Sequence, residues 1–264
     1  MFFGSLAPST QAIRRQILER FRADHGDKPI ALLPQRFIVL MLGKLKPSVA
    51  IGWLSAIRHL MQYAVSANLC EIDPTQGIRL KTPKSDGIYT WSEQDIAAYE
   101  AGHGVGTKAR LALALGLYTA QRRNDVLRMG RQHIHDGILS VTALRIPVHP
   151  DLRAIIDATP GGHLTFLSTR TGKPYAGDNF SEQFRAWCKA ARLPEKCSFH
   201  GLRKAACRRL AEAGCSVNEI AAISGHATLR DVQRYTKAVD QERMARNAMA
   251  RQVNDIATTG VKSG

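Results

Sequence analysis

The sequence lacks the features of a membrane-spanning or disulfide-bonded protein. No apolar stretch reaches the roughly 18 residues that a transmembrane helix needs. The start of the chain, MFFGSLAPSTQAIRRQ, has too short an apolar run for a signal peptide. The five cysteines include no CxxC pair and are odd in number, which favours reduced thiols over disulfides or a zinc site. We therefore expect a cytosolic protein without a membrane span.

Acidic residues are scarce, and glycine-rich phosphate-binding loops are absent. Aspartate and glutamate number 22 against 37 lysines and arginines, which gives a formal net charge of +15 and a pI near 10.0. Both the first 86 residues and the rest of the chain are net basic. There is no Walker-type loop and no GxGxxG motif. The charge predicts a polyanionic partner, with nucleic acid as the first candidate, although ribosomal and membrane-surface proteins are also basic.

What the sequence does contain is apolar periodicity typical of helices. Residues 1–75 predict a small helical bundle, whose first helix is expected to start at a Ser9 cap. Prolines, glycines and basic residues without periodicity predict a basic linker at residues 76–88. Residues 89–238 predict a second, mixed domain, and residues 239–264 a C-terminal helix and tail.

The second domain includes one region with a strand pattern. Its first helix is expected to follow a capping box formed by Thr90 and Glu93. Short strands are expected at Ile138–Thr142, at Leu144–Val148 and in the HLTFL segment at residues 163–167. Helical patterns occupy the rest, so the predicted fold class is mainly α with a small β-sheet (α+β).

Two basic clusters contain residues suited to bind an anion. In HGLRK, His200 and Arg203 are three positions apart at the start of a helix, so they share one face. A solvated basic helix would show the same pattern. In TAQRRNDVL, Arg122 follows an apolar helix, with Asp125 three residues later. This arginine is either anchored and pointed into a cleft or part of a weak surface pair.

The stretch GHATLRDVQRYTK places a histidine and a tyrosine in a polar segment near the end of the chain. Gly225 fits a helix stop, so His226 is expected at a tight corner between two short helices. Tyr235 follows nine positions later, among polar neighbours. Taken alone, the histidine also fits a structural cap or a buried position, and the tyrosine fits a half-buried helix position.

Taken in order, an arginine, an HxxR pair, a GH pair and a tyrosine nine residues later resemble the tyrosine recombinases, the phage integrase family. The resemblance covers most of the chain and implies a helical core-binding (SAM-like) domain, a basic linker and a mostly helical catalytic domain. The catalytic residues that it implies are Arg122, His200, Arg203, His226 and Tyr235, with Asp125 in a supporting role. Ala120 and Asp125 stand where the family usually has glycine and glutamate.

The family's sixth catalytic residue, a lysine in the turn of a β-hairpin, has no counterpart. Between Gly137 and Pro150 there is no lysine, and the turn around Thr142 and Ala143 is unusually short. Either the protein lacks this lysine, or the printed sequence closes over residues of a flexible hairpin tip. We expect the second, which an intact mass above 29.1 kDa would support.

The resemblance implies site-specific DNA recombination through a 3′-phosphotyrosyl intermediate and a Holliday junction, for integration or excision of a mobile element. Tyr235 would be the nucleophile, His200 the base, and His226 a hydrogen-bond donor to a nonbridging oxygen. Arg122 and Arg203 would clamp the phosphate, because planar guanidinium groups match its geometry. The phosphotyrosyl bond keeps the energy of the phosphodiester, so neither ATP nor a metal nor another cofactor is implied.

The implied partners are a double-stranded DNA attachment site, further copies of the chain in a tetrameric synapse, and an accessory DNA-bending or directionality factor. The protein would be cytoplasmic and nucleoid-associated. The residues expected to contact DNA are Lys46, Arg58, Lys81, Lys84, Lys204 and Arg208. Met244, Ala248 and Met249 suggest an apolar face that docks either on a neighbouring subunit or on its own domain.

Other functions fit parts of this pattern. RRLAEAGCSVNEIAAISGHATLRDVQRY also has the rhythm of a helix-turn-helix, as in a non-catalytic DNA-binding regulator. That interpretation leaves Arg122 and the nine-residue spacing unexplained. A chromosome-dimer resolvase or a type IB topoisomerase would use the same chemistry, and we prefer the integrase. The chain begins almost directly in a helix cap, which is compatible with an arm-binding segment upstream of Met1 and equally with none.

Overall fold

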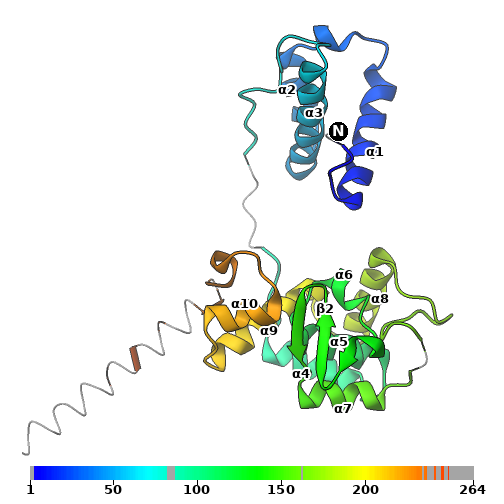
Figure 1. Cartoon of the computed structure of the whole chain (residues 1–264), viewed down its shortest axis with the longest axis vertical. Helices are drawn as coiled ribbons and strands as arrows, with labels where there is room; N and C mark the ends of the chain where they lie inside the picture. The colour runs from blue at the N-terminus through cyan, green and yellow to red at the C-terminus, as the bar shows by residue number, and fades with distance from the viewer. Residues whose placement is uncertain are drawn as a thin grey trace, which may run out of the picture. The chain divides into compact units, whose positions relative to one another are not determined.

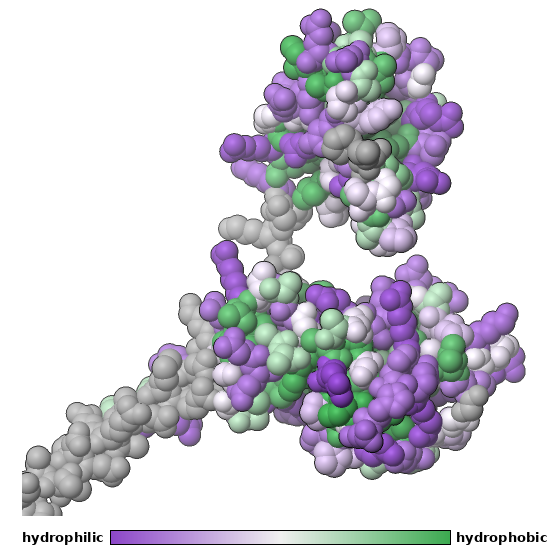
Figure 2. Space-filling model, viewed as in Figure 1, coloured by the Kyte–Doolittle hydropathy of each residue, from purple (hydrophilic) through white to green (hydrophobic). Residues whose placement is uncertain are grey.

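The computed structural model of the chain describes residues 3–81, 87–161, 163–233, 235, 236, 241, 245, 246 and 249. The chain divides into two units, Met1–Ser85 and Asp86–Gly264, which Figure 1 shows as ribbons. Each unit buries its own apolar core. On the face shown in Figure 2, hydrophilic side chains cover much of each unit.

The first unit is helical. Its elements are α1 (Pro8–His25), the 3-10 turn η1 (Ile30–Leu32), α2 (Gln35–Gly43) and α3 (Pro47–Ser66). Helix α3 packs against α1 and α2, and its residues Trp53, Ile57 and Met61 form the middle of the core. Ile78, which lies within the expected linker, is also buried in this core.

Helix α1 starts before the expected cap. Pro8 takes the first helical position, where its fixed φ suits a helix and its missing N–H leaves no donor unsatisfied. Ala7 is the N-cap residue, and no side chain caps this helix. The prediction of a Ser9 cap is therefore wrong, because Ser9 lies inside the first turn.

The second unit is mostly helical and contains one small sheet. Its helices are α4 (Glu93–Gly102), α5 (Lys108–Thr119), α6 (Arg123–Val126), η2 (Arg131–His133), α7 (Pro150–Ala158), α8 (Gly177–Ala190), α9 (Phe199–Glu212) and α10 (Val217–Ser224). Helix α5 is apolar on nearly every side because it is buried in the core, where it packs against α7 and α9. Figure 1 shows α5 behind the sheet.

Helix α4 begins with a capping box, two residues later than predicted. The Ser92 hydroxyl accepts a hydrogen bond from the Asp95 backbone N–H, and the Asp95 carboxylate accepts one from the Ser92 backbone N–H. The predicted box of Thr90 and Glu93 is wrong. Glu93 instead pairs with two arginines of α9.

The sheet has three antiparallel strands in the order β1 (Ile134–His135), β2 (Ile138–Val141) and β3 (Leu144–Pro147). Strands β2 and β3 are the predicted hairpin, with Val141 paired to Leu144 at its tip. The predicted strand at residues 163–167 is absent. There the Phe166 backbone N–H donates to the Met129 carbonyl oxygen, in a loop that offers no neighbouring strand.

A small separate core joins α9 and α10 to the segment that carries Tyr235. Its buried residues are Ala120, Ala206, Cys207, Ala211, Ile220 and Val232, and Tyr235 packs against them. The predicted fold class, mainly α with a small β-sheet, is confirmed. In the described part of the chain, no helix has both the length and the apolar character needed to cross a membrane.

Candidate active site

The first arginine of the predicted set stands in the bend between α5 and α6. Ala120 ends α5 in the left-handed region, with φ of 52°. That conformation costs an L-residue about 1 to 2 kcal/mol and suits glycine better. Gln121 holds the bend, because its side-chain amide donates to the carbonyl oxygens of Thr119 and, at 2.6 Å, Ile223. Arg122 follows as the exposed N-cap of α6.

Helix α9 carries the HxxR pair in its first turn. Ser198 caps the helix, so His200 and Arg203 lie where the helix begins. Arg203 is 3% exposed, and its Nη1 donates to the Ala120 carbonyl oxygen at 2.7 Å. This bond fixes the guanidinium beside the bend that carries Arg122. His200 is exposed.

The corner after α10 positions the second histidine. Gly225 ends α10 with φ of 68°, and a Cβ added there would lie 2.8 Å from Cδ1 of Leu144 on β3. Only glycine therefore suits this corner. Nδ1 of His226 lies 2.7 Å from the hydroxyl oxygen of buried Ser224, which leaves Nε2 for another partner. The rings of His226 and Tyr235 are 6.3 Å apart between centroids.

Electrostatic interactions connect these side chains. Burial, then the charges of Arg203 and Arg122, lowers the pKa of His226 from its ordinary 6.5 to about 4. His200 keeps an exposed edge, but neighbouring atoms still shield part of its ring from water, and this desolvation, followed by the charges of Arg203, Lys204 and Arg122, lowers its pKa. Both histidines are therefore neutral near pH 7, within a cluster of fixed positive charge.

The buried guanidinium of Arg203 lies at the centre of this cluster. Burial and then Arg122 lower its pKa, whereas the acidic groups of Tyr235 and Asp125 act in the opposite direction. The structure thus brings together all five predicted catalytic residues. An excess of fixed positive charge with two neutral imidazoles suits an anion that gains charge during reaction.

A cleft of about 710 Å³ opens beside the cluster. Arg122, Asp125 and His200 line it, together with the exposed side chain of Ile88. Asp125 makes no ion pair with Arg122 among the described residues, so the predicted anchoring of that arginine is not seen. The carboxylate acts on the cluster through its charge, as its effect on the pKa of Arg203 shows.

The β2–β3 hairpin closes without a lysine. Thr142 and Ala143 form a two-residue turn, with Thr142 at φ of 52°, and the chain is continuous through it. The expectation that residues are missing from the hairpin tip is therefore wrong. Strand β3 contacts α10, so the hairpin still packs against the corner of His226.

The residues predicted to contact DNA lie in different surroundings. Lys46 and Lys81 are exposed, and Lys84 lies outside the described residues. Lys204 donates to the Ile88 carbonyl oxygen. Arg208 forms ion pairs with Glu93 and Glu212 of its own unit.

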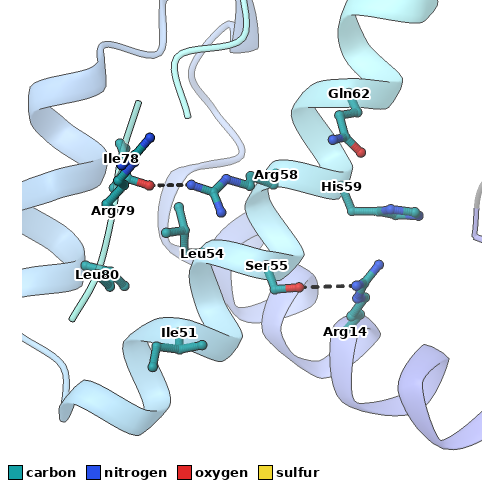
Figure 3. A pocket seen from close by; sticks show the side chains of 10 residues that line it. All are labelled: Arg14, Ile51, Leu54, Ser55, Arg58, His59, Gln62, Ile78, Arg79 and Leu80. Carbon is teal, nitrogen blue, oxygen red and sulfur yellow. Dashed lines mark hydrogen bonds between the residues drawn. The ribbon is translucent and has the colours of Figure 1, made fainter. Parts of the chain in front are cut away.

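Arg58 lines a basic pocket of about 700 Å³ in the first unit, shown in Figure 3. Its guanidinium donates to the Ile78 carbonyl oxygen, and across the same pocket Arg14 donates to Ser55 Oγ at 3.2 Å. Of the predicted docking face, Met244 and Ala248 lie outside the described residues, and Met249 is exposed.

Two residues that hold the site were not predicted. Gln121 ties the bend after α5 to α10, and Ser224 orients the His226 imidazole. Their positions in the sequence could have indicated them, because Gln121 directly precedes Arg122 and Ser224 lies two residues before His226. No group of three or more histidine, cysteine, aspartate or glutamate side chains is placed to hold a metal in the described part of the chain.

The fold of this chain is similar to that of solved integrases. A solved lambda integrase dimer bound to a COC′ core site has a TM-score of 0.76 and 20% identity, over 88% of this chain and 89% of that chain. A lambda integrase tetramer bound to a Holliday junction has a TM-score of 0.73 and 21% identity, over 85% and 73%. The Tn1549 transposon integrase in complex with circular intermediate DNA has a TM-score of 0.71 and 15% identity, over 90% and 94%.

Sequence comparison extends this likeness beyond the fold. No curated protein matches the chain by sequence. Residues 94–242, more than half of the chain, match the model of the phage integrase family. This span contains the bend of Arg122, the first turn of α9, the corner of His226 and the segment of Tyr235. The chain therefore belongs to the phage integrase family, the tyrosine recombinases.

Proposed function

We propose that this chain is a site-specific tyrosine recombinase of the integrase type, which cuts and rejoins DNA through a covalent 3′-phosphotyrosyl intermediate. One observation carries the proposal: two arginines and two histidines, from the start of α6, the first turn of α9 and the corner after α10, gather in one cluster with Tyr235. The integrases of similar fold, which are bound to a core site and to a Holliday junction, support it.

The two arginines act as the phosphate clamp. Arg203 is buried and held by the Ala120 carbonyl oxygen, so its guanidinium is oriented before DNA arrives. Arg122 stands exposed on the next helix and can close on the phosphate from the solvent side. Preorganised donors of this kind contribute on the order of 100-fold each to the rate of similar reactions.

Tyr235 needs help to react, because a phenol with a pKa near 10 is ionised only about once in a thousand molecules at pH 7. Neutral His200 accepts its proton, and the surrounding positive charge stabilises the phenolate. His226 presents Nε2 to a nonbridging oxygen. We assign the tautomer in which Nε2 carries the proton and Nδ1 accepts a hydrogen bond from the Ser224 hydroxyl, so that Nε2 can donate to the phosphate.

The cleavage step forms the bond between Tyr235 Oη and phosphorus and breaks the bond between phosphorus and the 5′ oxygen. The tyrosine proton goes to His200. Because the hairpin has no lysine, we assign the proton taken up by the 5′ oxygen to water. If the 5′ bridging oxygen is replaced by sulfur, the departing thiolate needs no proton. Such a substrate should therefore be cleaved much faster than the natural one. Attack by a 5′ hydroxyl reverses the step without ATP or metal.

In this proposal the partner is a double-stranded attachment site, on which four copies of the chain exchange strands through a Holliday junction. The protein would act in the cytoplasm on a mobile element, with an accessory DNA-bending or directionality factor. Lys46, Arg58, Lys81, Lys84 and Lys204 remain predicted DNA contacts, whereas Glu93 and Glu212 neutralise the charge of Arg208. The lambda and Tn1549 integrases of similar fold favour this role over that of a chromosome-dimer resolvase.

The test uses a nicked duplex that carries the attachment site and traps the covalent intermediate, which is then resolved on a denaturing gel. We expect a protein–DNA adduct with the parent chain and none with Tyr235→Phe. Binding without an adduct would instead support a non-catalytic regulator built on the α9–α10 turn. Adducts without strand exchange between two sites would indicate topoisomerase-like relaxation.

A further inference from the structure

The cleft beside the catalytic cluster extends past it, between the segment of α6 and helix α8. Beyond Arg122 and His200, it is lined by Arg123, Asn124 and Arg128 from the α6 segment and by Ser181 and Arg185 from α8. All of these residues belong to the second unit. The five residues past the catalytic pair have no role in the proposed cleavage step.

The arginines of this extension differ in their partners. Arg123 donates to Ser181 Oγ and to Asn124 Oδ1, so it joins α6 to α8. Arg128 and Arg185 are exposed, and neither side chain makes a hydrogen bond or ion pair with any described residue. Among the lining residues the one carboxylate is Asp125, which forms no ion pair with either arginine. Two unpaired guanidinium groups from different elements therefore line one cleft.

We propose that Arg128 and Arg185 form a second phosphate-binding subsite, which holds a phosphodiester next to the one at the catalytic cluster on the same DNA strand. The inference rests on the proposed function, because it places that strand along the cleft. Arg128 follows Arg122 by six positions, past the single helical turn of α6, and both side chains line the same cleft. A strand that lies along this cleft therefore offers Arg128 a different phosphate from the one held by Arg122.

The subsite binds and positions DNA and takes no part in the chemical step. Guanidinium groups match phosphate geometry, and each phosphate contact releases counterions from the duplex. The hydrogen bond from Arg123 to Ser181 joins the α6 segment, which carries Arg128, to helix α8, which carries Arg185, and so fixes the spacing between these elements. A strand held at both phosphates cannot slide past the catalytic cluster, so the subsite sets which phosphodiester faces Tyr235.

The test measures the affinity of the full chain for a short duplex of arbitrary sequence over a range of salt concentrations. The double variant Arg128→Ala/Arg185→Ala is compared with the parent chain and with Arg170→Ala/Lys189→Ala. The control removes the same charge from exposed positions that do not line the cleft. We expect the subsite variant to bind more weakly and to lose about 0.9 from the slope of log K against log salt, which is one phosphate contact. The control should keep the parent slope.

A second measurement separates this inference from the proposed function. At saturating nicked attachment-site DNA, the subsite variant should still form the Tyr235 adduct, but at neighbouring phosphodiesters as well as at the parent position, because the strand is no longer held in register. An adduct in the parent chain, together with equal salt slopes in all three proteins, would overturn the subsite and leave the recombinase proposal standing. A parent chain that binds no DNA even at low salt would overturn both.

Discussion

The two ends of helix α9 are both basic, but they are built differently. At the start, His200 and Arg203 make no ion pair within the described part of the chain, and Arg203 is held by a backbone carbonyl. In the last turns, Arg208 and Arg209 both bind the Glu93 carboxylate of α4, and Arg208 also binds Glu212. The start leaves positive charge for a ligand, whereas the end neutralises it within the fold.

This difference shows that residue type alone does not mark a catalytic arginine. In the sequence, HGLRKAACRRLAE is one basic stretch, and its two ends look equally suited to bind phosphate. The partner that distinguishes them, Glu93, lies more than a hundred positions away in the chain. The surroundings of each arginine then decide whether its guanidinium stabilises the fold or is free to stabilise a reacting anion.

The largest expected difference between the two ends lies in catalysis. Arg203→Lys keeps the charge but loses the planar fork, so the rate of adduct formation should fall on the order of 100-fold or more. Arg208→Lys, on the same helix, should leave the rate nearly unchanged. Single-turnover cleavage of a nicked duplex measures both, with thermal unfolding as the control for folding. Equal losses in the two variants would remove the distinction between the ends.

The response to acid should also separate the catalytic cluster, to which the start of α9 belongs, from the last turns of that helix. The folded pKa of His226, about 4, lies below its ordinary 6.5, so the unfolded chain binds a proton that the folded chain rejects. The free energy of unfolding should therefore fall as the pH drops from 6.5 towards 4. Urea unfolding at a series of pH values measures this slope. His226→Gln should flatten it, and an unchanged slope in that variant would show that the histidine is not held neutral.

At the other end, the Arg208 and Arg209 guanidinium groups hold the pKa of Glu93 below its ordinary 4.5, Arg209 having the larger effect. This contribution is fully present above about pH 4.5 and is lost as the pH falls through the lowered pKa of Glu93, so its loss begins at the acid end of the His226 window. Because Glu93 is half exposed, Glu93→Gln should lower the free energy of unfolding by only about 1 kcal/mol at pH 7. Urea unfolding tests this, and adduct formation should persist. Loss of the adduct would place the end of α9 within the catalytic machinery.

Much of the fold follows from patterns that are local in the sequence. Apolar periodicity predicts the helical bundle of the first unit, and the strand pattern predicts the β2–β3 hairpin within a few residues. The predicted helix caps are wrong where a neighbouring residue takes the capping position instead. Pro8 starts α1 in place of a Ser9 cap, and Ser92 with Asp95 caps α4 because Glu93 is bound by arginines.

The sequence identified which residues form the site, but it did not show how they are brought together. The order of Arg122, His200, Arg203, His226 and Tyr235 indicated the family, but their convergence depends on long-range bonds such as Gln121 to Ile223. The HLTFL segment has the composition of a strand, yet a strand requires a partner, which the fold does not place there. The free arginines of α8 and the α6 segment have no sequence signature, because being unpaired is a property of the folded chain.

The central claim is that Tyr235 is the nucleophile, and the most direct measurement is to identify the amino acid that becomes linked to DNA. The protein is first incubated with a library of nicked duplexes of random sequence, and the duplexes that become covalently bound to it serve as the substrate. The protein–DNA adduct is then digested, and mass spectrometry locates the amino acid that carries the nucleotide. The account predicts a nucleotide attached through a 3′-phosphate to Tyr235, and no adduct from Tyr235→Phe. Attachment to any other residue, or an adduct that survives this substitution, would contradict it.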